Sequence, residues 1–495
     1  MEEMKTCVII GGGIGGLVTG ALLAKEGYRV TVLEKNAIIG GGLQTFKRNG
    51  VSFPTGMHVF GGFQQGGNMR KLFEYLGIMD KIMLQSMDAD ASDVVTMVDD
   101  QTTYRLPQGK ERFISYLSKL FPAEKEHLEA YVNMLFELSE EEDLFYLRET
   151  NENSYQHSDD FLNSVNQLMD QFIQDPKLKA LLAYLNGLTG GAGETTPAYI
   201  HALLSTLHIN GTFQFIDGSQ QLADALKEVI ETYGGQVIAN EEVVKVEVEN
   251  HVVTGVVTRK GNHYQADSYI SDVHPDVLLR IADQQAFTTA FKHRVQSIPE
   301  TPSSFKVYIK FKEKSFPYLN HANFCLSEAN SWPKKMMYVT PPIKHQGEFA
   351  ETMVAVTEMD FDQVKPWEDT LTGHRGEAYE LWKQTMTDKV LEVMERQYPH
   401  FRDQIEFVFA SSPLTIRDYF GNKHGSNYGF QKDSNDLMLS QMSVSTKVKN
   451  LFLTGQNVNI HGLCGVSLTA IETVEALVGR NAIVSKINIF CLNHP

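Results

Sequence analysis

The residues of this sequence with the clearest chemical use are three glycines and one acid near its start. Gly11, Gly13 and Gly16 follow a G-x-G-x-x-G spacing, and Glu34 lies eighteen residues after Gly16. In this pattern the first glycine permits a tight turn, the second lets the backbone approach a pyrophosphate, and the third lets a helix pack closely on a sheet. A carboxylate in the position of Glu34 accepts hydrogen bonds from a ribose diol. The spacing therefore predicts a dinucleotide site.

Positioning these groups requires a strand, a turn, a helix and a second strand in that order. Residues 7–10 are a short apolar run, residues 17–26 have a small and apolar helical pattern ended by Gly27, and residues 30–33 form a second apolar run. The helix N-terminus would offer free N–H groups and the positive end of its dipole to phosphates. The structural alternative is a glycine-rich turn in an unrelated α/β protein, and the order of the elements favours the dinucleotide.

A second strand–glycine–helix pattern stands near the other end of the chain. Residues 451–454 are an apolar strand, Gly455 follows, and a loop to Gly465 precedes a helix that we expect from about Ser467. A far glycine loop favours FAD over NAD, because the longer cofactor must reach a second domain. The helix dipole would stabilise the anionic reduced flavin. Since a second complete G-x-G-x-x-G is not seen, the sequence leaves the electron partner open.

Composition and charge bound the class of protein. The 495 residues are 42% hydrophobic and 21% charged, as in a globular protein of two or three domains. The net charge of -17 disfavours nucleic acid as a partner, and also a basic patch that binds anionic lipid. Apolar stretches end well short of the ~20 residues of a membrane span, and we recognise no secretory signal. The four scattered cysteines predict no metal site and a reducing compartment. The expected location is the cytoplasm, with peripheral membrane contact left open.

The order of patterns along the chain predicts an α/β fold with a discontinuous domain. Residues 110–185 carry helical signals, and strands are expected at 303–311, 351–358 and 405–409 with a long helix at 379–398. We expect a Rossmann-like FAD-binding domain assembled from three chain segments, with an inserted α+β substrate domain. The expected FAD-binding segments are 1–110, 213–290 and 446–485, the substrate domain comprises 111–212 and 291–445, and a C-terminal tail covers 486–495.

Several short motifs together resemble those of the FAD-dependent amine oxidase and phytoene desaturase superfamily. The first group comprises the N-terminal glycine run, Gly41-Gly42 with Thr45, residues 218–222 (GSQQL) and residues 454–466 (TGQNVNIHGLCGV). Residues 56–61 (GMHVFG) resemble the G-x-H segment of carotenoid desaturases and retinol saturase. Residues 413–419 (PLTIRDY) and 425–429 (GSNYG) resemble the carotenoid isomerase and retinol saturase branch.

The resemblance implies FAD as the cofactor and gives its contacts. It places the adenosine ribose at Glu34, the adenine at the backbone of Val243 or Val244, and backbone N–H groups of residues 465–466 near the flavin. Asn457 stands where the family often has Asp or Glu, which predicts a weaker contact to cofactor hydroxyls. The full expected cofactor-binding set is Gly11, Gly13, Ile14, Gly15, Gly16, Glu34, Lys35, Gly41, Gly42, Val243, Gly455, Asn457, Gly465 and Val466.

Three residues are weak catalytic hypotheses. His58 lies in the glycine-rich segment and could donate a proton or orient a substrate, with a structural hydrogen bond to the backbone as the alternative. His461 lies in the expected flavin loop, with the same two interpretations. Tyr428 could line a substrate channel or serve packing. Cys464 stands beside the flavin loop, but it lacks a partner cysteine, so a redox role is not expected.

The resemblance predicts an FAD-dependent oxidoreductase that acts on a carbon–carbon double bond of a polyene or isoprenoid lipid, such as a carotenoid or retinoid. Hydride exchange with flavin N5 would give saturation, desaturation or cis–trans isomerisation, and an apolar tunnel would exclude water. A flavin amine oxidase is one alternative; such enzymes frame the flavin with an aromatic cage and a lysine–water pair, and no aromatic pair stands near the C-terminal loop. A flavin- and lipid-binding protein without turnover is another. The expected partners are an apolar small-molecule substrate and an unidentified electron donor or acceptor.

Overall fold

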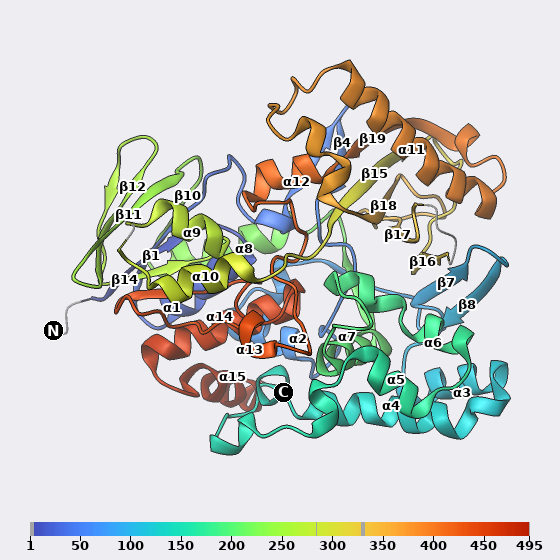
Figure 1. The fold of residues 1–495 in the computed structure, drawn as a ribbon, viewed down its shortest axis with the longest axis horizontal. Coiled ribbons are helices and arrows are strands. Elements are labelled where there is room, and N and C mark those ends of the chain that lie inside the picture. The colour runs from blue at the N-terminus through green and yellow to red at the C-terminus, as the bar shows by residue number, and fades with distance from the viewer. Residues whose placement is uncertain (1–3, 284, 328–331, 495) are drawn as a thin grey trace.

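The computed structural model describes residues 4–283, 285–327 and 332–494 of the chain. Figure 1 shows an α/β region at the left of the view, a second sheet beneath α11 (Glu377–Gln397) at the upper right, and a group of helices at the lower right. The N-terminus lies at the outer edge of the α/β region. These three regions meet at the middle of the molecule, where the candidate site lies.

A parallel sheet joins strands from three distant parts of the chain. Its order within the described residues is β10–β2–β1–β14–β20, and each neighbouring pair is parallel. The strands are β1 (Thr6–Ile10), β2 (Arg29–Leu33), β10 (Gln236–Ile238), β14 (Ser268–Ser271) and β20 (Leu451–Leu453). Their apolar runs suit a sheet that is covered on both faces. The predicted Rossmann-like α/β fold, built from three chain segments, is confirmed.

Alternate side chains of β1 point to the two covered faces. Cys7 and Ile9 pack in the same buried cluster as Leu17 of α1, whereas Val8 and Ile10 pack with a second cluster. The first face carries α1 (Ile14–Lys25), α8 (Gln220–Thr232) and α14 (Gly462–Val478). The second face carries α9 (Pro275–Ile281), α10 (Thr289–Ser297) and an antiparallel sheet of β11 (Val243–Glu249), β12 (Val252–Thr258) and β13 (His263–Tyr264). Strands β12 and β13 pair antiparallel as a hairpin around Gly261.

The second sheet has the order β19–β15–β18–β17–β16–β7–β8 within the described residues. Its strands are β7 (Asp93–Met97), β8 (Thr102–Leu106), β15 (Ser303–Phe311), β16 (Ala322–Leu326), β17 (Lys335–Val339), β18 (Thr352–Met359) and β19 (Ile405–Ser411). On one face Phe305, Val307 and Ile309 pack with side chains of α11. The strands and long helix predicted for this part of the chain are confirmed, with small shifts at their ends.

Two boundaries in the expected organisation are wrong. The first expected FAD-binding segment, 1–110, includes residues 93–106, but β7 pairs in parallel with β16 and β8 pairs with β7, so both strands belong to the second sheet. The expected C-terminal tail is instead the end of helix α15 (Ala482–Asn493), which packs on α2 (Asn68–Leu76). Ile483 and Ile487 of α15 are fully buried, which is the spacing of one helix face.

The lower right region in Figure 1 is helical, as predicted for residues 110–185. It contains α3 (Lys110–Leu120), α4 (Lys125–Glu140), α5 (Val165–Phe172), α6 (Pro176–Leu182) and α7 (Ala198–Asn210). Smaller elements connect the regions: β3 (Thr45–Arg48), β4 (Val51–Pro54), β5 (Phe60–Gly61), β6 (Leu84–Ser86), β9 (Thr212–Phe215), α12 (Pro413–Phe420) and α13 (Leu437–Ser440).

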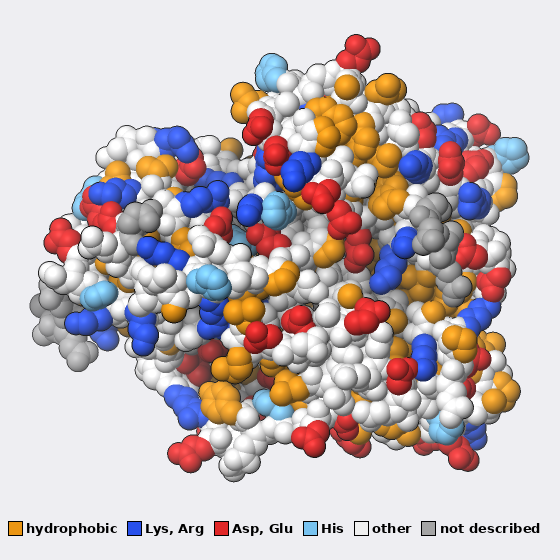
Figure 2. Space-filling view, viewed as in Figure 1, with side chains coloured by type: hydrophobic (Ala, Val, Ile, Leu, Met, Phe, Trp, Pro, Cys, Tyr) orange, Lys and Arg blue, Asp and Glu red, His pale blue; other side chains and the backbone are white. Residues whose placement is uncertain are grey.

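No single helix in the described residues has the length and apolar composition to cross a membrane. Helices α14 and α15 have the required length and apolar composition only when taken together, and the chain bends by 114° between them. In Figure 2 acidic and basic side chains are interspersed over the visible face.

Candidate active site and cofactor cavity

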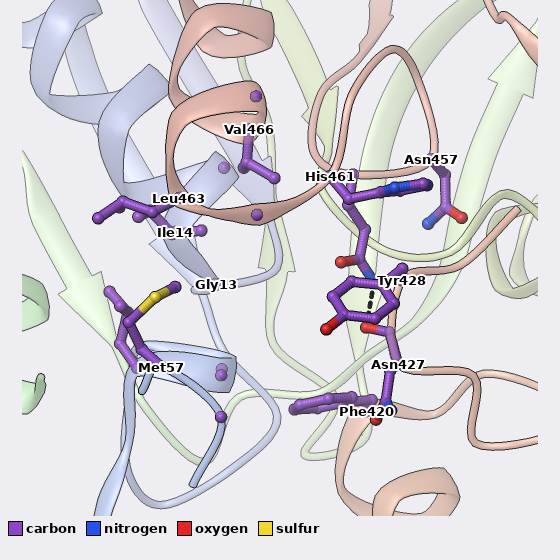
Figure 3. A pocket seen from close by; sticks show the side chains of 18 of the residues that line it. Gly13, Ile14, Met57, Phe420, Asn427, Tyr428, Asn457, His461, Leu463 and Val466 are labelled. Atoms are coloured by element: carbon purple, nitrogen blue, oxygen red, sulfur yellow. Dashed lines mark hydrogen bonds between the residues drawn. The ribbon is translucent and has the colours of Figure 1, made fainter. Parts of the chain in front are cut away.

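A cavity of about 880 Å³ lies where the three regions meet. The carboxyl ends of β1 and β2 and the start of α14 line one part, and α7 with the strands β16–β18 lines another. In Figure 3, Ile14, Met57 and Leu463 lie across this space from Tyr428 and Phe420. The carboxyl edge of a parallel sheet is where α/β proteins bind ligands, so the fold itself selects this place.

The glycines form a cradle in which backbone segments touch one another. A Cβ on Gly16 would lie 2.1 Å from the Gly11 carbonyl oxygen, and a Cβ on Gly15 would lie 2.9 Å from the Gly455 Cα. The loop around Gly40 is held against this turn, since the Gly40 N–H donates to the Gly12 carbonyl at 2.7 Å. This close approach places the N-terminus of α1 at the cavity, where the positive end of the helix dipole favours an anion such as a pyrophosphate.

Glu34 directly follows β2 beside the cradle and is 5% exposed. Its two carboxylate oxygens accept the N–H groups of Gly12 and Asn36, each at 2.8 Å. Further out, Glu242 and Arg259 form a two-bond ion pair that also lines the cavity. Burial lowers the pKa of the neighbouring Lys35 ammonium, and the Glu34 charge offsets part of that effect. This end of the cavity therefore has a carboxylate that could accept hydrogen bonds from a ribose diol.

Asp272 is a member of the cavity that the sequence did not reveal. It directly follows β14, and its Oδ1 would lie 2.2 Å from a Cβ on Gly15 and 2.3 Å from one on Gly455. Burial raises the pKa of Asp272 to about 7, and the Glu34 charge adds to this, although the Gly16 and Gly13 N–H groups oppose it. A position directly after a strand next to β1 is the signal that could have indicated it.

The C-terminal helix begins earlier than predicted. Helix α14 starts at Gly462 rather than near Ser467, so Gly465 and Val466 lie in its first turns rather than in a loop. A Cβ on Gly465 would lie 2.7 Å from the Ile460 carbonyl carbon, which explains the glycine. The helix N-terminus therefore faces the cavity with its free N–H groups, as the flavin-side prediction requires.

Asn457 and His461 hold the neighbouring chain segment in place. Asn457 Oδ1 accepts the Phe430 N–H at 3.0 Å, and His461 Nε2 lies 3.2 Å from the Phe430 carbonyl oxygen. Burial lowers the pKa of His461 to about 3, and the charge of Lys432 adds to this. The ring of Tyr428 lies 5.7 Å from that of His461, and both line the cavity. These contacts agree with the structural interpretation of His461.

His58 lies beside a buried lysine. Both of its ring nitrogens are buried without a hydrogen bond to any described residue, and burial together with the Lys306 charge lowers its pKa to about 3. Lys306 of β15 donates to the Thr55 carbonyl at 2.9 Å, and burial lowers its pKa to about 8. Both residues line the cavity. At neutral pH His58 is thus uncharged, and Lys306 is the group that carries a proton.

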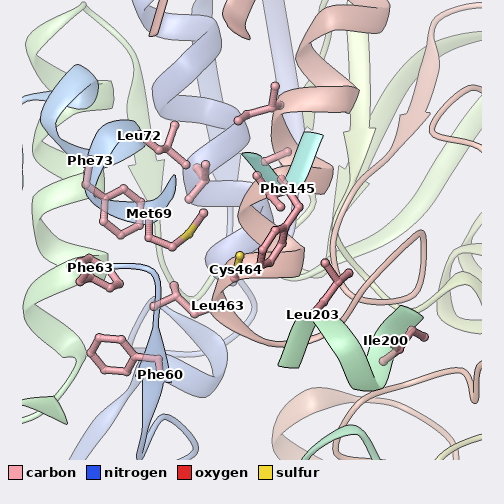
Figure 4. Close-up of a cluster of buried hydrophobic side chains, with 14 of the residues drawn as sticks. Phe60, Phe63, Met69, Leu72, Phe73, Phe145, Ile200, Leu203, Leu463 and Cys464 are labelled. Atoms are coloured by element: carbon pink, nitrogen blue, oxygen red, sulfur yellow. The ribbon is translucent and has the colours of Figure 1, made fainter. Parts of the chain in front are cut away.

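The remaining lining is mostly apolar. Leu203, Leu204 and Leu207 of α7 face Phe324, Met337 and Val356 of the second sheet; we call this part the apolar arm. Figure 4 shows the buried cluster behind it, where Leu203, Phe145 and Leu463 lie near Cys464. Burial raises the pKa of the Cys464 thiol to about 12, so a reactive thiolate is disfavoured. The arm suits a hydrocarbon chain.

The structure brings nearly all of the predicted residues together. Every member of the expected cofactor-binding set lines the cavity except Gly16 and Gly455, which pack behind it. The three catalytic hypotheses, His58, His461 and Tyr428, line it too. Their contacts with a cofactor stay predictions. The glycine contacts fit a dinucleotide, because side chains at these positions would fill the cradle.

The cradle, the parallel sheet and the opposed helix N-terminus define a dinucleotide-binding protein of Rossmann type. The chain belongs to the flavin containing amine oxidoreductase family, whose model matches residues 14–476. It is therefore an FAD-dependent oxidoreductase.

Relatives and solved structures agree with this family. The all-trans-retinol 13,14-reductase of Danio rerio is 24% identical over 97% of this chain and 87% of its own length. Prolycopene isomerase 2 of an Oncidium hybrid cultivar is 22% identical over 92% of this chain and 80% of its own. The solved structure of an oxidoreductase from Methanosarcina mazei covers 95% of this chain and 100% of its own, with 16% identity and a TM-score of 0.66. The resemblance to the carotenoid isomerase and retinol saturase branch is thus confirmed.

Proposed function

We propose that this oxidoreductase acts on a carbon–carbon double bond of a polyene or isoprenoid lipid. The observation that carries the proposal is that one cavity is lined both by the glycine cradle and by the apolar arm. A long hydrocarbon in the arm would therefore reach the cofactor without crossing solvent. The names of the retinol reductase and prolycopene isomerase relatives support the same substrate class.

The chain's own residues would supply binding, water exclusion and a proton. FAD bound in the cradle would supply hydride exchange at flavin N5. Leu203, Leu207 and Phe324 would hold the hydrocarbon through apolar contact and keep water out. Lys306 would hold the proton that saturation of a double bond consumes, because its ammonium lies in the cavity wall beside the uncharged His58.

The test is an anaerobic incubation of the FAD-loaded protein, oxidised and reduced, with carotenoids, retinoids and apolar steroids. Products are analysed by mass and by isomer. Gain or loss of a hydrogen pair, or a changed isomer without a mass change, supports the proposal. Binding of a polyene without any product supports instead the flavin- and lipid-binding alternative. An unchanged reduced flavin spectrum with no new product for every compound contradicts the proposal.

Amine oxidation is the second candidate because of Lys306. Lys306 is buried in β15 and lines the cavity, and it would take the place of the lysine that the amine oxidase resemblance implies beside the flavin. The predominance of leucine, methionine and phenylalanine in the arm favours a hydrocarbon over an amine. Peroxide release from a panel of mono- and polyamines in air would support this second function, and its absence would exclude it for those amines.

We also propose a cytoplasmic location with peripheral membrane contact, and we leave the electron donor or acceptor unassigned. The four free thiols suit a reducing compartment. Apolar substrates reside in membranes, and Ile489 and Leu492 of α15 are exposed by 58% and 80%. The segments 140–150 and 316–345 are further candidates for this contact from the sequence, but Phe145 and Phe316 within them are buried. Flotation with neutral liposomes tests this contact, and failure to float contradicts it.

A further inference from the structure

A buried acid at the far side of the cavity holds two other polar groups. Asp93 opens strand β7 and is 1% exposed. Its Oδ2 accepts the Tyr184 hydroxyl at 2.8 Å and lies 2.9 Å from His208 Nδ1. Neither the flavin chemistry nor the cradle uses these residues. Burying a carboxylate this deeply costs free energy unless hydrogen bonds compensate for its lost hydration.

His208 and Tyr184 line the same cavity as the residues of the apolar arm. His208 follows Ile200, Leu204 and Leu207 along α7, and all four line the cavity. The Tyr184 ring packs edge-on against Phe324, with ring centres 4.9 Å apart. His208 is therefore the polar residue on an otherwise apolar face, at hydrogen-bonding distance from an acid behind it.

The acid fixes which hydrogen bond His208 can make toward the cavity. In the tautomer whose Nδ1 donates to the Asp93 carboxylate, Nε2 carries the lone pair. Among the described residues, the one hydrogen bond of the His208 ring is that of Nδ1 to Asp93. A lone pair in an apolar arm accepts a hydrogen bond from an O–H group and finds no partner in a hydrocarbon or ether.

We infer that Asp93, His208 and Tyr184 form a subsite for the hydroxyl group of an apolar alcohol. The hydrocarbon part of the alcohol lies along the apolar arm, and its O–H donates to His208 Nε2. This inference rests on the proposed function, since it names the end group of the same substrate. Asp93 acts as a positioning residue, because it sets the tautomer of His208 without touching the ligand.

The subsite also discriminates between end groups. A carboxylate would meet the lone pair of His208 with the negative charge of Asp93 behind it, so an acid of the same chain binds more weakly. A methyl ether removes the donor and leaves Nε2 unpaired. His321 lies near Asp93, and burial together with the Arg105 charge lowers the pKa of His321 to about 4, so His321 adds no positive charge at neutral pH that would attract an acid.

The test compares retinol, retinyl methyl ether and retinoic acid as probes for the FAD-loaded protein. Dissociation constants are measured from the change in polyene absorption or fluorescence. The native protein should bind retinol about tenfold more tightly than the ether. In His208→Asn the amide keeps a donor toward Asp93 and has no atom at Nε2, so the preference for retinol should disappear. In His208→Gln an amide oxygen can reach the Nε2 position, so part of the preference should return.

A matched control is His201→Asn on the same helix. His201 is equally buried and contacts Tyr131 and Asn186, and it does not line the cavity. This variant should keep the preference for retinol. FAD loading and Tm are measured for each variant to detect loss of folding. If His208→Asn does not fold, the preference of His208→Gln for retinol decides the test. Equal binding of retinol and ether by the native protein, or a preference that survives His208→Asn, overturns the subsite. Failure of all three probes to bind overturns the proposed function for retinoids and the subsite with it.

Discussion

The Glu34 carboxylate accepts a hydrogen bond from the backbone N–H of Gly12, with Oε2 2.8 Å from the nitrogen. The same carboxylate accepts the Asn36 N–H, so it is fixed at the mouth of the glycine turn. An acid held in this way is preorganised to accept a ribose diol without reorienting. The glycine turn and the acid are therefore one unit, and loss of the charge should affect cofactor affinity rather than the fold alone.

The first prediction follows from that unit. Glu34→Gln should weaken FAD binding by about tenfold to a hundredfold, because hydrogen bonds to a charged group are worth more than those to a neutral amide. Quenching of flavin fluorescence on titration of apoprotein measures the change. Glu249→Gln, at the exposed end of β11, is the control and should leave FAD affinity unchanged. Equal affinity of Glu34→Gln and native protein would remove Glu34 from the cofactor site.

The second prediction concerns pH and Asp272, which lies among the cradle glycines with a pKa raised to about 7. The pyrophosphate is an anion, so its arrival raises this pKa further and binding takes up a proton. By linkage FAD should bind most tightly below pH 7, and Kd should rise by up to about tenfold per pH unit above it. Asp272→Asn should remove this dependence and bind FAD at high pH as the native protein does at low pH.

Titration of FAD into apoprotein between pH 5.5 and 9 measures both curves. Glu34, Lys35 and Lys306 also line the cavity, and their effects are common to both proteins. The difference between the native and Asp272→Asn curves therefore isolates Asp272. Parallel curves would show that Asp272 does not sense the phosphates.

The sequence alone was sufficient to predict those parts of the site whose residues lie close together along the chain. The turn around Gly13 and the acid Glu34 belong to one strand–helix–strand unit, so their spacing along the chain determines their spacing in space. Asp272 and Lys306 come from strands far along the chain, and their neighbours depend on sheet pairing that spacing does not encode. For the same reason residues 93–97 were assigned to the FAD-binding domain, since the partner strand β16 lies more than two hundred residues later.

Lys306 was not predicted as a site residue, although the residue pattern of β15 indicates its unusual position. In β15, Phe305, Val307 and Ile309 alternate with Ser304, Lys306 and Tyr308, and the structure turns the first set to the core under α11. Alternation in a strand indicates two faces with different surroundings. A lysine on the second face of a strand that is buried almost throughout points to a cavity or a buried partner.

The third prediction tests Lys306 as the proton source. Its pKa near 8 means that the ammonium form dominates below pH 8, so turnover that consumes a proton should fall as pH rises above that value. Lys306→Met should lower the rate of double-bond saturation by about a hundredfold and abolish this alkaline limb. FAD loading should be unaffected. Product formation against pH, with the polyene that gives turnover, measures both effects.

Lys310→Met is the matched control on the same strand. Lys310 pairs with Glu351 at 3.5 Å and does not line the cavity, so its loss should change neither the rate nor the pH profile. A full rate with an unchanged alkaline limb in Lys306→Met would mean that the proton comes from elsewhere. His58→Asn then becomes the next variant, because neutral His58 still carries one N–H.

The fourth prediction tests the close packing behind the cradle. A Cβ on Gly15 would lie 2.9 Å from the Gly455 Cα and 2.2 Å from Asp272 Oδ1, so Gly15→Ala must push apart the two halves of the cofactor domain. Alanine improves helix propensity by about 1 kcal/mol, which the overpacking offsets. We expect the free energy of unfolding to fall by about 1–3 kcal/mol and FAD binding to weaken. Gly347→Ala, where a Cβ meets nothing within 4 Å, should be neutral in both. Urea unfolding and FAD titration of the two variants measure the contrast, and equal stability of Gly15→Ala and native protein would show that the backbone at the cradle yields without cost.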